Sequence, residues 1–358
     1  MNFNEILNSI VEELEVIPNR KKYWLIRTQS GSLYDTFVEN NFVGLDHREV
    51  SIKNLSSLRK RFIDDNKFLD SIKEVVEDYF LDKEDKKSED QDTVSKRAIS
   101  LISNQIFKFY QNVRKGDIVI IPSYSSSKIA FGQICESNIA EFTESEIRKF
   151  DYTTQFLNKR VNWLADFDKS KLDPNIFKMF TSHQAINDVS KYADVIERSL
   201  QDFFILDNEA HLIINVQKND DIRAKDLFGL GYNFLEIFDN IAKELNIEGV
   251  SSNDLEVKVN VNSPGKIDLK SGIKKTTVLA GIILLICGGG YVAKDGTSFK
   301  TDGIKALIDA ISDYKDREQD RDIKMQIFKK YQDSMQVKSP DDMIKIMKQV
   351  DSNKDLPK

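Results

Sequence analysis

Apolar positions along the chain follow two spacings. Segments in which they recur every three or four residues predict amphipathic helices, because an α-helix turns once in 3.6 residues. Short runs rich in β-branched and aromatic residues, or strict alternation of apolar and polar positions, predict strands. The helical spacing covers residues 1–18, 98–110, 188–205 and 222–246, and the strand patterns cover 23–26, 118–121, 129–134, 211–216 and 255–261. This mixture predicts an α+β fold.

The clearest local pattern is a hairpin in the first half of the chain. Gly116 and Asp117 form a turn before the strand 118–121, and Pro122 ends that strand. The serine-rich loop 123–127 then leads into the strand 129–134. Two strands separated by a short polar loop predict an antiparallel pair with the serines at its tip.

One stretch departs from both spacings. Residues 276–293 (TTVLAGIILLICGGGYVA) hold eighteen residues without a charge, with charged residues directly before and after them. A helix of this length reaches roughly 27 Å, close to the ~30 Å hydrocarbon core of a bilayer. We therefore expect one transmembrane helix within residues 273–294. The alternative is a core helix, which can also be apolar on every side.

Glycines inside this run bear on what such a helix would do. Small residues allow close approach of helices in a membrane, so several copies of the span could pack around one axis. On this basis a channel formed by an oligomer and a plain membrane anchor both stay open. The glycines expected to support packing are Gly281, Gly288, Gly289 and Gly290.

Composition narrows the class of protein. The chain has 358 residues, of which 40% are hydrophobic and 31% are charged, so it can form real cores but is no polytopic transporter. The net charge of −6 provides no global basic field for nucleic acid. Two cysteines and three histidines, all far apart in the sequence, indicate neither a disulfide framework nor a zinc site.

Three segments carry a resemblance to a known family. In chain order they read YWLIRTQSGSLYDTFVENNFVGLD, KGDIVIIPSYSSSKIAFGQI and KRVNWLADFDKSKLDPNIFKMFTSHQAINDVSKY, and together they span roughly residues 20–200. They resemble the N-terminal module of Mrr-like prokaryotic restriction and defence proteins, which belongs to the PUA-like group with the EVE and YTH domains. The resemblance implies a small, mostly antiparallel β-barrel whose mouth recognises a nucleotide or an unusual base.

The same segments contain side chains suited to such a ligand. Aromatic faces stack on bases, while hydroxyl and guanidinium groups bind phosphates and base edges. For each residue alone, a core aromatic or a surface ion pair is the simpler interpretation; as a set they favour a binding mouth. The candidate ligand-binding residues are Trp24, Arg27, Ser30, Tyr34, Ser123, Tyr124, Ser125, Arg160 and Trp163.

These patterns divide the chain into four parts. We expect a PUA/EVE-like sensing domain with flanking helices in residues 1–205 and a small α/β linking or oligomerisation domain in residues 206–272. The transmembrane helix then occupies residues 273–294, and a charged helical region occupies residues 295–358.

Catalytic motifs are sparse. Asp254 and the Glu256-Val257-Lys258 triplet are similar to the acidic and E-x-K elements of restriction-type nucleases, which hold magnesium with carboxylates. The triplet also fits the polar face of an ordinary strand. Walker A, GxGxxG, GxSxG and HExxH motifs are absent. We expect no enzyme, with no catalytic residue, metal site or cofactor.

Two functions of different classes follow. The first is a membrane effector of a bacterial antiphage defence system, which senses a nucleotide or oligonucleotide and opens or perturbs the inner membrane, with its N-terminal domains in the cytoplasm. Its expected partners are that ligand, membrane lipid, other copies of the chain, and a nucleotidyltransferase or another defence protein. The second is a reader of modified DNA with restriction-type nuclease activity, in which the apolar run is a core helix.

Overall fold

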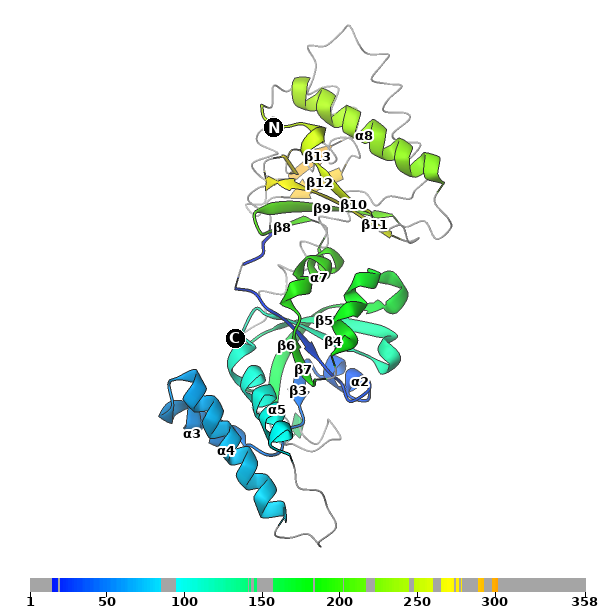
Figure 1. The fold of residues 1–358 in the computed structure, drawn as a ribbon. Helices are drawn as coiled ribbons and strands as arrows, with labels where there is room; N and C mark the ends of the chain where they lie inside the picture. Colours follow the sequence, from blue (N-terminus) through cyan, green and yellow to red (C-terminus); the bar gives the residue numbers. More distant parts are fainter. Residues whose placement is uncertain are drawn as a thin grey trace. The chain divides into compact units, whose positions relative to one another are not determined.

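The computed structural model describes residues 15–18, 20–84, 95–140, 142, 145–146, 157–182, 184–201, 203–216, 223–244, 248–259, 265–273, 275–276, 278, 289–292 and 298–301. The chain forms two compact units. We call Arg20–Ala193 the central unit, and Met1–Asn19 together with Asp194–Lys358 the flanking unit. Each unit contains helices and its own sheet, so the α+β class holds (Figure 1).

The central unit is built on one curled six-stranded sheet, a half-barrel. Its strands lie in the order β3-β6-β5-β4-β2-β7, and all neighbours are antiparallel except the parallel pair of β2 and β4. The bounds are β2 Tyr23–Ile26, β3 Phe42–Leu45, β4 Ile118–Pro122, β5 Lys128–Ile134, β6 Leu157–Asp168 and β7 Ile186–Asp188. The serine-tipped hairpin expected from the sequence is the pair β4–β5.

Apolar runs and one glycine shape this sheet. All residues of β2, β3 and β4 are buried, which accounts for their continuous apolar sequences. The register between β5 and β6 shifts at Phe131 and Gly132, as in a β-bulge, which increases local bending. A Cβ on Gly132 would lie 2.3 Å from Val161 Cγ1 on β6, so a larger residue at this position would clash with the neighbouring strand.

Helices cover the core of the central unit. They are α2 Tyr34–Glu39, α3 Ile52–Arg61, α4 Asp65–Glu84 and α5 Lys96–Phe107, and α5 continues into the π-helical turn η1 Lys108–Asn112. Serine side chains cap two of them: Ser51 accepts a hydrogen bond from Asn54 N, and Ser95 accepts one from Ala98 N. Helix α4 packs against both α3 and α5. Short 3₁₀ turns occupy Tyr124–Ser126, Lys169–Lys171, Pro174–Thr181 and Ser190–Tyr192.

The flanking unit contains a five-stranded sheet in the order β1-β8-β9-β11-β10. The strands are β1 Glu15–Val16, β8 Phe203–Leu206, β9 Glu209–Val216, β10 Glu256–Val259 and β11 Gly265–Gly272; the helices are α7 Ala193–Leu200, α8 Ala224–Glu244 and the 3₁₀ turn η6 Ser252–Asp254. The short strand β1 runs parallel to β8, although about 190 residues separate them in the sequence. The expected domain boundary between residues 205 and 206 falls inside β8.

The expected transmembrane helix is wrong. In the parts of the chain that the structure describes, no helix is both long and apolar enough to span a bilayer. Gly289–Val292, inside the expected span, form strand β12, which pairs antiparallel with β13 Ser298–Thr301. Consecutive glycines cost a helix about 1 kcal/mol each relative to alanine, whereas Tyr291 and Val292 favour strands. Length and apolar character alone were an insufficient basis for the helix.

Several other expectations depended on the transmembrane helix. The inner-membrane location, the lipid partner and the membrane-opening activity lose their basis and are not carried further. Gly289 and Gly290 belong to a strand, so they are no helix-packing glycines. Gly281 and Gly288 lie outside the described residues, as does most of the expected helical region 295–358; its described part, Ser298–Thr301, is a strand.

Candidate functional site

The two tryptophans expected at a ligand mouth pack within the central unit. Trp24 is 1% exposed, and its Nε1 donates a hydrogen bond to Asp117 Oδ2 at 2.9 Å. Trp163 is partly buried against the same core, and its Nε1 donates to the carbonyl of Phe37 at 3.2 Å. Trp24 therefore has no ring face free for a ligand base.

Asp117 explains why a Gly-Asp turn precedes β4. Its buried carboxylate accepts hydrogen bonds from Trp24 Nε1, from Lys22 N at 3.1 Å and from Arg114 N at 2.9 Å. Three N–H donors satisfy a carboxylate that would otherwise be costly to bury. This cluster joins the beginnings of the parallel strands β2 and β4, so it has a structural role.

Arg160 lies away from the serine-rich loop. In the register of β5 and β6, Lys128 at the loop pairs with Asp168, whereas Ile134 at the other end pairs with Val161. Arg160 is thus near the opposite end of the sheet, where it forms an ion pair with Glu146 and lies 4.5 Å from the ring centroid of Phe142.

Four of the expected residues do come together, where two loops touch. Gly31 approaches the 3₁₀ turn so closely that a Cβ on it would lie 2.2 Å from Tyr124 N. Thr28 Oγ1 donates a hydrogen bond to the carbonyl of Pro122 at 2.5 Å. This loop junction gathers Ser30, Ser123, Tyr124 and Ser125. Its backbone takes the left-handed conformation at Gln29, Ser30, Gly31, Ser125 and Ser126.

Tyr34 is a buried residue at the same end of the sheet as the loop junction. The side chain is 4% exposed, and its hydroxyl donates to Asp166 Oδ1 at 2.6 Å. Burial and this hydrogen bond to a carboxylate raise the pKa of Tyr34 well above its ordinary value. The phenol therefore stays protonated and holds Asp166 in place.

Arg27 anchors the segment that precedes β7. Its Nη2 donates to the carbonyls of Phe180 and Ser182, both at 2.6 Å, and its backbone N–H donates to Ala185 O at 2.8 Å. Partial burial lowers the pKa of Arg27 from its ordinary value. The guanidinium thus fixes residues 180–182 next to the end of β2. Among described atoms, its buried Nε has no hydrogen-bond partner.

The segment that Arg27 fixes forms one wall of a groove, and α5 forms the other. The groove has a volume of about 810 Å³. Six of its residues recur at helical spacing on one face of α5 and its π-helical extension, and three come from the 181–184 segment. The nine described lining residues are Arg97, Ser100, Leu101, Asn104, Gln105, Lys108, Thr181, Ser182 and Gln184. We call this the α5 groove.

The side chains of the α5 groove suit an anionic ligand that also forms hydrogen bonds. Two cations, three amides and three hydroxyls line it, with Leu101 as the apolar member, and the nine described residues include no carboxylate. Lys108 Nζ lies 3.5 Å from Gln184 Oε1, so it bridges the two walls. Gln105 Oε1 lies 3.1 Å from His47 Nε2, which fixes that amide. Lys108 begins the π-helical turn, a feature frequent at functional sites.

The spacing of apolar residues predicts the helix 98–110 but not this groove. The signal available was the polar face of the helix, where Arg97, Ser100, Asn104 and Lys108 recur without an acidic residue. The opposite wall lies more than 70 residues away in the sequence, so no local pattern indicated that the two would meet.

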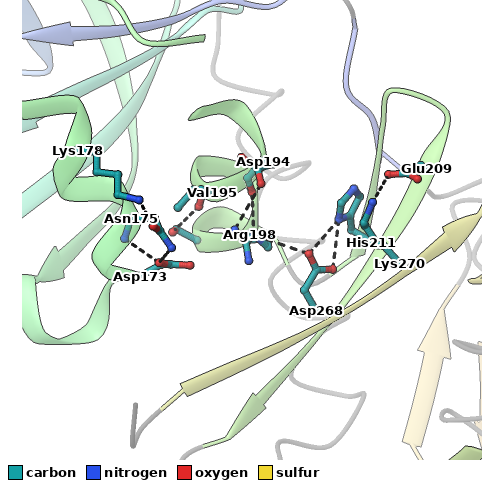
Figure 2. Close-up of polar contacts among 11 residues, drawn as sticks. Asp173, Asn175, Lys178, Asp194, Val195, Arg198, Glu209, His211, Asp268 and Lys270 are labelled. Carbon is teal, nitrogen blue, oxygen red and sulfur yellow. Dashed lines mark hydrogen bonds and ion pairs between the residues drawn. The ribbon is translucent and has the colours of Figure 1, made fainter. Parts of the chain in front are cut away.

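The flanking unit contains a buried polar network (Figure 2). His211 Nδ1 lies 3.2 Å from both carboxylate oxygens of Asp268, and the ring of His211 stacks on Phe204 at 4.7 Å. Arg198 Nε lies 3.8 Å from Asp268, and Arg198 Nη2 lies 3.5 Å from Asp194. His211 and Asp268 are 3% and 1% exposed, so this network ties α7 to the sheet rather than meeting a substrate.

The E-x-K triplet lies on β10, at the edge of this sheet. Glu256 Oε2 forms an ion pair with Lys270 Nζ at 3.0 Å, and the same lysine reaches Glu209 at 2.7 Å. Within the described ranges, no three His, Cys, Asp or Glu side chains are grouped so that they could hold a metal ion. The described contacts of Glu256 are those of a cross-strand ion pair.

Comparison with protein-family models, with curated proteins and with solved structures found no match for the chain.

Proposed function

We propose that the central unit binds a nucleotide or a single-stranded nucleic acid, and that the α5 groove receives a phosphate of this ligand. The observation that carries the proposal is the composition of the groove: Arg97 and Lys108 line it together with amides and hydroxyls, and no carboxylate is among the described lining residues. Guanidinium and ammonium groups are the usual protein partners of phosphates, and amides and hydroxyls bind base edges.

The positions of the two cations add support. In α5 and its extension they are eleven residues apart, which corresponds to about three turns of one helix face. A rigid helix holds them at a fixed spacing, while Arg27 fixes the facing wall through two carbonyls. Such preorganisation lowers the entropy lost on binding. The resemblance to Mrr-like modules points to the same class of ligand and to a role in bacterial defence.

The test measures the affinity of the full chain for a fluorescent thymidine dodecamer and for thymidine monophosphate. Replacing both groove cations, Arg97→Gln with Lys108→Gln, should weaken binding of both ligands about 10- to 100-fold. The slope of log affinity against log salt for the dodecamer should fall by roughly 1.4, since each phosphate contact to a single strand contributes about 0.7.

A matched double variant controls for overall charge. Lys53 and Lys67 are exposed lysines in the first turns of α3 and α4, and changing both to Gln alters the net charge by the same amount. This control should bind within twofold of the wild type. If it loses as much affinity as the groove variant, or if neither ligand binds the wild type below millimolar concentration, the proposal is wrong.

A further inference from the structure

One edge of the central sheet gathers the ends of three adjacent strands. β2 and β4 are parallel neighbours, so both finish at this edge, and β7 is antiparallel to β2, so it begins there. The hydrogen bonds of Arg27 and Thr28, described above, join the three connections to one another. The wall of the α5 groove and the loop junction at Tyr124 are therefore parts of one edge.

Tyr124 is displayed at this edge on a rigid turn. Its side chain is 75% exposed, although large aromatic rings are usually at least partly covered. The backbone beneath it is fixed: Ser127 N and Ser127 Oγ both donate to the carbonyl of Tyr124, at 3.1 and 3.0 Å, and Ser126 N donates to Ser123 O at 2.9 Å. Gly31 packs against the other side of the turn. The ring is exposed, and the loop that carries it is ordered by these contacts.

Exposed lysines lie on the segments next to this turn. Lys128 follows the turn and is exposed. Lys169 N donates to Ser127 O at 2.8 Å, which places the backbone of the 3₁₀ turn Lys169–Lys171 beside the Tyr124 turn. Lys171 is also exposed and forms a weak ion pair with Asp168 at 3.4 Å. Three lysines thus lie on the segments next to the hairpin tip, and two carboxylates, Asp166 and Asp168, lie on the adjoining end of β6. An exposed aromatic ring with nearby lysines is the arrangement by which proteins hold single strands: the ring stacks on a base and the cations follow the backbone.

We infer that Tyr124 is a base-stacking platform for a strand whose phosphate lies in the α5 groove, so that the ligand of the central unit is a single-stranded oligonucleotide and not a mononucleotide. The inference rests on the proposed function and adds a second contact point to it. The ligand then spans the sheet edge from the groove to the hairpin tip.

The experiment compares the thymidine dodecamer with thymidine monophosphate on the full chain and on variants at this one position. Tyr124→Ala should weaken dodecamer binding about 5- to 150-fold, the range measured for loss of one stacked base. The same variant should leave binding of the monophosphate unchanged. Tyr124→Phe, which keeps the ring, should bind the dodecamer within twofold of the wild type.

A second readout separates stacking from charge. Because tyrosine carries no charge, Tyr124→Ala should lower the affinity for the dodecamer without changing its salt slope, in contrast to the groove variant. Thermal unfolding of each variant should match the wild type, since the side chain is exposed.

The inference is overturned if Tyr124→Ala binds both ligands as the wild type does, or if the dodecamer binds no more tightly than the monophosphate. Should the groove variant still lose affinity for the monophosphate in that case, the proposed function stands and only the stacking platform fails. Absence of binding by either ligand to the wild type overturns both.

Discussion

Lys159 on β6 places a charged side chain inside the central unit. The residue is 0% exposed, its Nζ donates to the carbonyl of Ser137, and it lies 5.8 Å from the ring centroid of Phe109. Burial lowers the pKa of Lys159 to about 8, and the attraction of Asp117 only partly opposes this shift. The folded protein therefore holds this proton less tightly than the unfolded chain does.

This difference predicts a pH dependence of stability. The unfolded lysine keeps its proton up to about pH 10.4, whereas the folded one releases it near pH 8, so the unfolded state binds more protons between these values. The free energy of unfolding should rise through this window, by roughly 3 kcal/mol in total from this group. Urea unfolding at pH 7, 8, 9 and 10 measures it.

Lys159→Met supplies the comparison for that experiment, since it removes the titrating group and keeps a long side chain. The difference in unfolding free energy between wild type and variant should change with pH in favour of the wild type between pH 8 and 10. A difference that stays constant over this range would show that Lys159 keeps an ordinary pKa in the folded protein.

At the residue scale, the type of side chain alone does not predict whether an aromatic residue is buried or exposed. Trp24 and Tyr124 were both candidates for stacking, yet one is 1% and the other 75% exposed. Their neighbours carry the distinction: Trp24 lies in a continuous apolar strand, and Tyr124 lies among serines in a turn. Arg27 was expected to touch the ligand, and in the structure its described bonds orient the groove wall.

Among the elements, the loop junction depends on Gly31. The residue has φ = +98°, and a Cβ there would meet Tyr124 N at 2.2 Å and Tyr124 Cα at 2.4 Å. Gly31→Ala should therefore lower the free energy of unfolding for two reasons, the left-handed backbone and the clash with a backbone that cannot easily move. We expect a loss of about 2–4 kcal/mol and weaker dodecamer binding, measured by urea unfolding and fluorescence polarisation.

Gly116 is a matched control for that substitution. Its φ is +91°, but a Cβ on it would have no neighbour within 4 Å. Gly116→Ala should lower the free energy of unfolding by about 1 kcal/mol, because only the left-handed backbone conformation is unfavourable for alanine there. It should leave dodecamer binding unchanged. Equal losses at the two glycines would show that the contact between Gly31 and Tyr124 contributes nothing.

Local patterns predicted many elements but not their partners. The strands expected at 23–26, 118–121, 129–134 and 211–216 coincide with β2, β4, β5 and β9, because apolar β-branched runs are a local property. The pairing of β3 with β6 and of β1 with β8 joins segments more than 100 residues apart, which periodicity does not report. The apolar run suggested a helix up to residue 293, but its end, Gly289–Val292, forms a strand, in keeping with two glycines, a tyrosine and a valine.

On the scale of the whole molecule, the central unit is an insertion in the sequence of the flanking unit. Its first strand β2 and last strand β7 are neighbours: Val189 N donates to Tyr23 O at 2.8 Å, and Tyr23 N donates to Ser190 Oγ at 3.1 Å. The chain therefore enters and leaves this unit at adjacent positions. The unit also contains its own core of buried residues, from Trp24 to Ile186.

Both features predict that residues 20–193 fold alone. Expressed as a separate chain, they should unfold in one cooperative transition and bind the dodecamer within about threefold of the full chain, because the described groove and loop junction lie inside these bounds. Circular dichroism with urea and fluorescence polarisation measure the two properties. A fragment that folds but does not bind would place part of the ligand site in the flanking unit.

The adjacent ends have a practical consequence. A domain that starts and stops at neighbouring points can be spliced into a surface loop of an unrelated reporter, such as a fluorescent protein or an enzyme, without pulling that loop apart. Ordering of the inserted domain by its ligand would then restrain the host loop and change the reporter's signal. The pairing of β2 with β7 thus makes this unit a ready cassette for a genetically encoded sensor, and a library of labelled oligonucleotides screened against such a fusion would identify the sequence it prefers.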